Sequence, residues 1–89
     1  MHARIVVSGP ELDDAMQALE EVRVGLGDAE LLGPAPLLRL RGRHRAQLVG
    51  KTAQPRALAT RTAALLSAAA VPMRRAGLMA VVDVDPQSL

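Results

Sequence analysis

The sequence predicts an α+β fold, a ferredoxin-like βαββαβ antiparallel sheet with two helices on one face. Short runs rich in β-branched residues and leucine alternate with two segments whose apolar residues recur every three or four positions. Prolines and glycines separate these segments. The chain has 89 residues, the size of one small domain, so we expect a single domain over residues 1–89.

The first strand and the first helix are predicted within residues 3–25. Residues 3–8 are mostly β-branched and stop at Gly9-Pro10, which is typical of a strand followed by a helix start. The helix is predicted from residue 10 to residue 25, and Gly25 and Gly27 end it. Its apolar face consists of Leu12, Ala15, Met16, Leu19 and Val22.

A hairpin is predicted next, with strands at residues 30–41 and 43–51 joined at Gly42. Pro34 and Pro36 exclude a helix and favour an extended path at the edge of a sheet. A second helix is predicted over residues 55–70, closed by Val71-Pro72. A basic loop over residues 73–77 and a last strand over residues 78–84 complete the order.

The charge of the chain is segregated, although its net value is only +2. Seven of the acidic residues lie within residues 11–30, whereas residues 31–82 contain arginines and one lysine but no acidic residue. Such a distribution indicates a basic face that meets an anionic partner. The chain has no cysteine, no apolar run long enough to span a bilayer and no secretory signal, so we expect a cytoplasmic protein.

Three patterns could indicate catalysis or metal binding, and each is incomplete. Gly50-Lys51-Thr52 ends like a phosphate-binding loop, but Arg45 stands where that loop needs its first glycine. Asp83 and Asp85 would share a strand face, yet no third metal ligand lies near them in the sequence. Ser8 lacks the surroundings of a nucleophile. We therefore expect neither an enzyme nor a resident cofactor.

Four arginines alternate with other residues across the predicted hairpin turn: Arg39, Arg41, Arg43 and Arg45. Alternate residues of a strand share a face, so we expect the four guanidinium groups on one ribbon, with Lys51 further along. Guanidinium groups match phosphate geometry. The chain has no aromatic residue for base stacking. The pattern therefore favours contacts to a nucleic-acid backbone.

Three segments in register resemble the C-terminal domain of the PriA primosomal replication-restart proteins. They are Leu32-Gly33-Pro34-Ala35-Pro36, the arginine segment from Arg39 to Leu48, and Asp83-Val84-Asp85-Pro86 near the end. Val7-Ser8-Gly9-Pro10 also fits the start of that domain, so the resemblance covers the chain. The alanine- and arginine-rich composition is typical of a high-GC member, such as those of actinobacteria.

The resemblance implies a non-catalytic domain that contacts branched DNA at stalled replication forks and assists loading of the replicative helicase. It implies packing against the helicase lobes of the parent chain and a share in the pocket for the acidic tail of single-stranded DNA-binding protein. ATP and zinc would belong to upstream domains of the parent, whose helicase motor is degenerate in some members. In this family an aromatic residue and a tryptophan usually stand where this chain has His44 and Ala46.

Arg56 is the residue predicted to bind the partner tail. It lies in the first turn of the predicted second helix, where a cation opposes the helix dipole, and it falls close to a family arginine that holds the terminal carboxylate of that tail. Two other functions fit the same residues. One is an interaction module that binds an acidic peptide and no DNA, and the other is a ribosomal or RNA-binding domain of the same fold.

Overall fold

The computed structural model describes residues 1–27 and 29–85, with the side chain of Asp85 excepted. Within these residues, four strands and three helices follow one another. They are β1 (His2–Gly9), α1 (Leu12–Gly25), β2 (Glu30–Leu40), β3 (Arg43–Lys51), α2 (Pro55–Ala68), α3 (Ala70–Arg75) and β4 (Met79–Asp85). None of the described helices is both long and apolar enough to cross a membrane.

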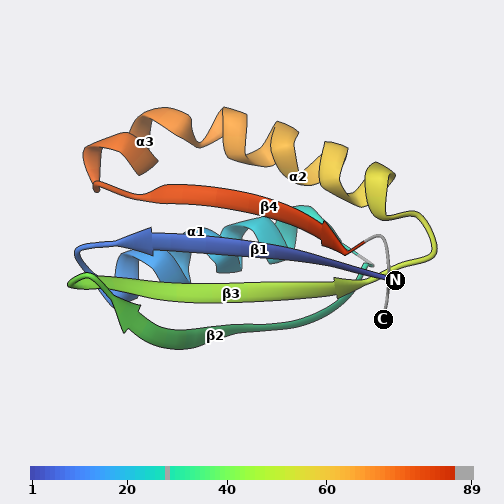
Figure 1. Ribbon diagram of the computed structural model, residues 1–89. Coiled ribbons are helices and arrows are strands. Elements are labelled where there is room, and N and C mark those ends of the chain that lie inside the picture. The colour runs from blue at the N-terminus through green and yellow to red at the C-terminus, as the bar shows by residue number, and fades with distance from the viewer. Residues whose placement is uncertain (28, 86–89) are drawn as a thin grey trace.

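The four strands form one antiparallel sheet in the order β2-β3-β1-β4 (Figure 1). Helix α1 packs on β1, β2 and β3, and α2 packs on β4 and β1 beside it. The two helices also contact each other, so both cover the same face of the sheet. This confirms the predicted α+β ferredoxin-like fold.

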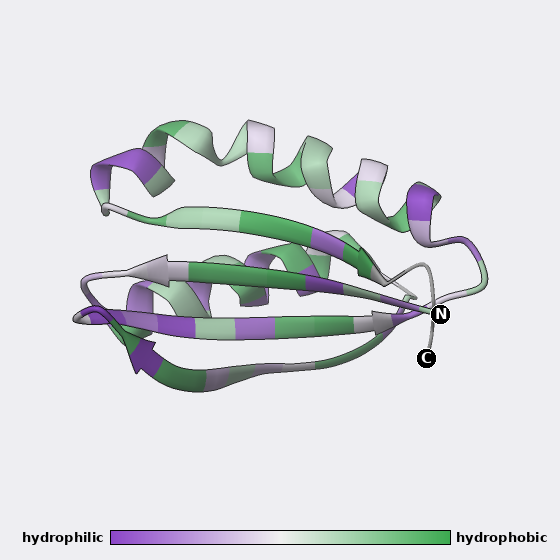
Figure 2. Cartoon of the chain, viewed as in Figure 1, coloured by the Kyte–Doolittle hydropathy of each residue, from purple (hydrophilic) through white to green (hydrophobic). Residues whose placement is uncertain are grey.

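Strand alternation decides which residues enter the core. In β1, Ala3, Ile5 and Val7 are buried under the helices, and their neighbours lie on the uncovered face. Leu19 and Leu26 fill the space between α1 and the sheet. The core is aliphatic because the chain has no aromatic residue. Figure 2 shows hydrophilic residues gathered instead in β3 near the hairpin turn and in α3.

The hairpin turn consists of two residues. Leu40 pairs with Arg43, so Arg41 and Gly42 form the connection. Their φ angles are 54° and 78°, which is the double left-handed conformation of a type I′ turn. Gly42 adopts this conformation without strain, whereas Arg41 adopts it at some cost. The predicted strand over residues 30–41 therefore ends one residue earlier, at Leu40.

Strand β2 lies at the edge of the sheet, as its prolines predict. Its register with β3 shifts twice, between Leu32 and Ala35 and between Leu37 and Leu40. The first shift spans Gly33, which has a φ of 110°, and the cis peptide bond to Pro34. An edge position tolerates these irregularities because only one side of the strand needs a regular ladder.

The basic loop predicted over residues 73–77 is wrong, because helix α3 continues to Arg75. Helix α2 ends at Ala68 and α3 begins at Ala70, so Pro72 occupies the first turn of a new helix. An N–H group there has no partner within the helix, and a proline at that position costs little. Met73 then turns inward and is buried.

Candidate nucleic-acid interface

The uncovered face of the sheet holds a hollow of about 360 Å³ beside the hairpin turn. Residues of β1, the hairpin and β4 line it: Arg4, Val6, Ser8, Leu40, Arg41, Arg43, Arg45, Met79 and Val81. We call this the arginine hollow. It has a cationic rim and an aliphatic floor, in which Met79 and Val81 are 63% and 61% exposed. The strand pattern of residues 78–84 alone did not predict this aliphatic floor.

Pairing between β1 and β3 brings the arginines together. Ala46 and Leu48 of β3 face the helices, so Arg43 and Arg45 face the opposite side. Ser8 of β1 lies directly across from Arg45. Arg4 joins the hollow from further along β1. Arg4 was not predicted as a site residue, although alternation within residues 3–8 already places it on the outward face.

Arg43 binds to the protein itself. Its Nη2 donates to the backbone oxygens of Ser8 at 3.0 Å and Gly77 at 2.8 Å, and its Nε donates to the Ser8 hydroxyl at 3.4 Å. These bonds join β3 to the end of β1 and to the turn before β4. The guanidinium group of Arg43 therefore ties three segments together, in addition to its predicted place among the four cations of the hairpin.

Replacing Arg43 by methionine is expected to lower the free energy of unfolding by about 1–3 kcal/mol, the cost of leaving carbonyl groups without a charged donor. The group is partly exposed, so the lower half of that range is expected. Arg45→Met is the matched control in the same strand, expected to change stability by less than about 0.5 kcal/mol. Urea unfolding followed by circular dichroism measures both. Equal losses in the two variants would contradict a tying role for Arg43.

The other hairpin arginines are less constrained. Arg45 Nη1 lies 3.4 Å from the Leu38 oxygen, a long contact, and Arg41 is exposed in the turn. Arg39 donates through Nη2 to the Gly42 oxygen at 3.1 Å. It is next to Leu40, which shares the face of Arg43, so Arg39 lies on the opposite face. The expected ribbon of four arginines is therefore corrected: Arg41, Arg43 and Arg45 share the hollow, and Arg39 does not line it.

Lys51 and Arg56 lie at the other end of the molecule. Strand β3 separates the hairpin turn from Lys51, and α2 begins shortly after it (Figure 1). The nine residues of β3 span roughly 27 Å. Both side chains are exposed. The structure thus divides the predicted cationic residues into a hairpin group and a distant pair.

Gly50 of the Gly50-Lys51-Thr52 segment has a packing role. It is buried, and a Cβ atom there would lie 2.6 Å from Leu58 Cδ2 of α2 and 3.2 Å from Leu31 Cδ2. Thr52 accepts a hydrogen bond at its hydroxyl from the Gln54 amide at 2.9 Å, just before α2 begins. The absence of a side chain at Gly50 therefore allows α2 to pack closely on the sheet.

Gly50→Ala is expected to lower the free energy of unfolding by about 1–3 kcal/mol, because an overpacked core must displace Leu58. The test is a double-mutant cycle with Leu58→Ala, which removes the clashing atoms. In that background the added methyl group should cost less than half as much. Urea denaturation of the four proteins gives the coupling free energy. An identical cost in both backgrounds would mean that Leu58 is not the obstacle.

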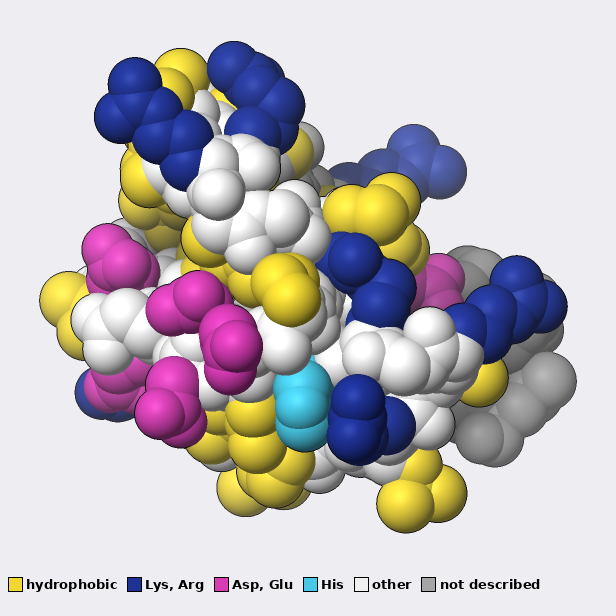
Figure 3. Space-filling model, turned by 90° about the vertical axis from the view of Figure 1, so that its left-hand side faces the viewer, with side chains coloured by type: hydrophobic (Ala, Val, Ile, Leu, Met, Phe, Trp, Pro, Cys, Tyr) yellow, Lys and Arg dark blue, Asp and Glu magenta, His cyan; other side chains and the backbone are white. Residues whose placement is uncertain are grey.

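Acidic side chains gather elsewhere. Figure 3 shows the end of the molecule that carries the hairpin turn, with carboxylates collected on one side and cations on others. In α1, Glu20 accepts hydrogen bonds from Arg23, which lowers the pKa of Glu20 and raises that of Arg23. Asp83 is exposed on β4, and the side chain of Asp85 lies outside the described residues. Within the described residues, no group of three or more His, Cys, Asp or Glu side chains could hold a metal ion.

The arginine hollow can bind an extended anion. Its cations reach it from β1, the hairpin turn and β3, and Val6, Met79 and Val81 give it aliphatic contact.

No curated protein matches the sequence. The family model described as primosomal protein N C-terminal domain matches residues 1–87. That range contains every described strand and helix, from His2 to Asp85. It agrees with the order of the glycine-proline, arginine and aspartate-proline segments. This chain therefore belongs to the family of C-terminal domains of primosomal protein N, the primosomal replication-restart protein.

Proposed function

We propose that this domain binds the phosphate backbone of forked DNA at the arginine hollow and so helps a replication-restart protein recognise stalled forks. The observation that carries the proposal is the convergence of Arg4, Arg41 and Arg45 around one hollow of about 360 Å³. Residues 31–82 contain no acidic residue, and Asp83 of β4, directly across from Arg4 in the sheet, is the nearest carboxylate in the strand pairing. Arg43 contributes charge at the same place while it holds the strands together.

The proposed contact reads DNA shape and charge. Readout of unpaired bases by stacking needs aromatic side chains, and this chain has none. Guanidinium groups bind phosphates in a bidentate manner and independently of sequence. Recognition of a branched substrate would then come from the positions of the phosphates and from neighbouring domains of the parent chain.

Fluorescence anisotropy of the intact chain with labelled forked DNA tests this proposal. Three phosphate contacts predict a slope of log K against log salt of about −3. Binding that is independent of salt would contradict it. Preference for an RNA fork of the same sequence would favour the RNA-binding alternative, because RNA differs from DNA in its 2′-hydroxyls and in its A-form groove geometry.

We also propose a second contact at Arg56, for the acidic tail of single-stranded DNA-binding protein. Arg56 is exposed in the first turn of α2, and the N-cap residue Gln54 provides no side-chain hydrogen bond there. Free amide groups at a helix start and a guanidinium group beside them suit a terminal carboxylate. Calorimetric titration of the parent protein with a tail peptide tests the contact, because helicase lobes of the parent would complete the pocket.

The remaining functions are proposed for the parent chain. The domain would pack against upstream helicase lobes and assist loading of the replicative helicase. ATP and zinc would be bound by those upstream domains.

A further inference from the structure

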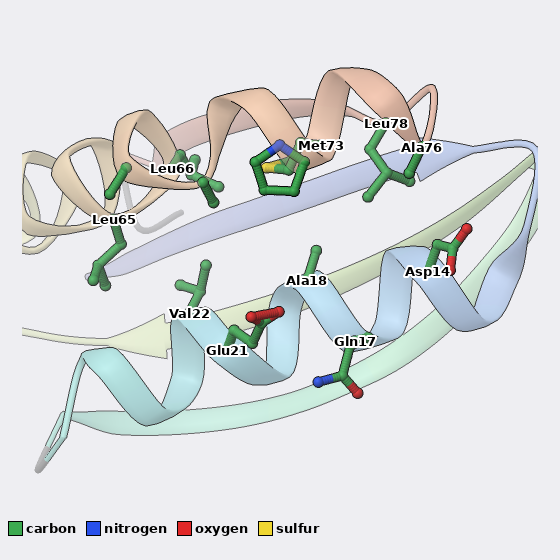
Figure 4. A pocket seen from close by; sticks show the side chains of 13 residues that line it. Asp14, Gln17, Ala18, Glu21, Val22, Leu65, Leu66, Met73, Ala76 and Leu78 are labelled. Atoms are coloured by element: carbon green, nitrogen blue, oxygen red, sulfur yellow. The ribbon is translucent and has the colours of Figure 1, made fainter.

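A groove of about 450 Å³ lies between α1 and the α2–α3 pair, on the opposite side of the sheet from the arginine hollow (Figure 4). Its walls are mostly aliphatic. The residues that line it are Asp14, Gln17, Ala18, Glu21, Val22, Leu65, Leu66, Ala68, Ala69, Pro72, Met73, Ala76 and Leu78. We call it the interhelical groove.

Helices α1 and α2 approach each other closely at one end of the groove. A Cβ atom on Gly25 would lie 2.8 Å from Leu65, and Arg61 Nη2 donates to the Leu26 oxygen at 2.9 Å. Both contacts lie at the C-terminal end of α1. Elsewhere the facing positions include Ala18, Ala69 and Ala76, whose short side chains leave the space between the helices unfilled.

The polar residues of the groove lie on one rim. Asp14, Gln17 and Glu21 are spaced three and four residues apart, so they form a row along the outer side of α1. Figure 4 shows Gln17 pointing away from the aliphatic side chains of α2, α3 and β4, whereas Asp14 rises from α1 on the side of Ala76 and Leu78. Among the described residues none of the three takes part in a side-chain hydrogen bond or ion pair, since Arg23 bonds to Glu20.

We propose that the interhelical groove binds an amphipathic helix of a protein partner, with apolar side chains toward Leu65, Leu66 and Met73 and basic side chains over the α1 rim. The lining of α1 runs from Asp14 to Val22, which is about 12 Å of helix and matches two turns of a partner. The lining residues include two carboxylates and no cation, so the occupant is expected to carry positive charge. The arginine hollow lies on the other face of the sheet, so the domain would hold DNA and this helix together.

Two synthetic peptides of about 14 residues test the groove. Both have leucine at every third or fourth position, and they differ only in carrying lysine or glutamate along one flank. The intact chain is titrated with each, and the methyl signals of Leu65, Leu66 and Met73 are followed by NMR. The lysine peptide should shift these signals and bind at least about fivefold more tightly than the glutamate peptide.

Variants of α1 distinguish the effect of the rim carboxylates on peptide binding from the effect of net charge. Asp14→Lys with Glu21→Lys should reverse the preference between the peptides. Glu11→Lys with Asp13→Lys makes the same change of net charge outside the groove, at the start of α1, and should leave the preference unchanged. Ala18→Arg, which keeps a good helix former, should fill the groove and weaken binding of the lysine peptide by at least about tenfold. Thermal unfolding confirms that each variant is folded.

Three results would overturn the proposal. They are a lysine peptide that does not bind the wild type, shifts that map to the arginine hollow, and equal effects of the rim variant and its charge-matched control.

Discussion

The variant Arg41→Asn with Arg45→Gln is expected to bind forked DNA about 30-fold more weakly than the wild type near 0.15 M salt. The estimate assumes that each side chain neutralises one phosphate and contributes about 0.9 to the salt slope, so the slope should fall by about 1.8. Asparagine is chosen for position 41 because it tolerates the φ of 54° that Arg41 adopts, and because Asn-Gly is a preferred sequence for a type I′ turn. Stability should therefore be retained.

The matched control for this variant is Arg74→Gln with Arg75→Gln. It removes two exposed cations from α3, which does not line the arginine hollow. Both double variants have the same net charge, so long-range attraction falls equally in each. Fluorescence anisotropy over a salt series compares them with the wild type. Identical slopes for the two variants would show that DNA responds to net charge and does not bind at the hollow.

Arg56→Ala in the parent protein is expected to weaken binding of the acidic tail peptide by roughly 1.5–3 kcal/mol, the value of one charge-assisted hydrogen bond. Arg56→Lys should recover only part of the loss, because an ammonium group lacks the planar fork that binds both carboxylate oxygens. The expected loss corresponds to at least about a tenfold change in Kd, which isothermal calorimetry resolves.

Arg75→Ala is the control for Arg56, since it removes another exposed arginine from a helix elsewhere in the domain. Affinity for the peptide should then remain close to that of the wild type. If Arg56→Ala also retained full affinity, Arg56 would be an ordinary solvated residue. DNA binding by the same variants provides an independent measurement, because Arg56 lies far from the hairpin turn.

Local patterns in the sequence predicted most of the fold. The alternation in residues 3–8, the helical spacing from Leu12 to Val22 and the glycine at position 42 each act over a few residues, and each element appears where expected. The error at residues 73–77 came from treating Pro72 as a terminator. A proline stops a helix that precedes it but is compatible with the first turn of the next one.

The candidate site was less predictable because it depends on distant pairing. The arginine spacing indicated the hairpin, yet the hydrogen bond from Arg43 to Gly77 joins residues 34 positions apart. The face of Arg39 depends on the two-residue turn that ends β2 at Leu40. Arg4 and Met79 enter the hollow only because β1 lies between β3 and β4. No local pattern contains that strand order.

The irregular outer strand β2 also limits how this molecule can aggregate. Unlimited growth of a sheet from molecule to molecule requires two edges that can each accept a new strand. Pro34 and Pro36 lack N–H groups, and the two register shifts interrupt the ladder on the β2 side. Among the described strands, β4 is the other edge. Joining two β4 strands closes a pair, so a fibril built through these sheet edges would stop at two molecules.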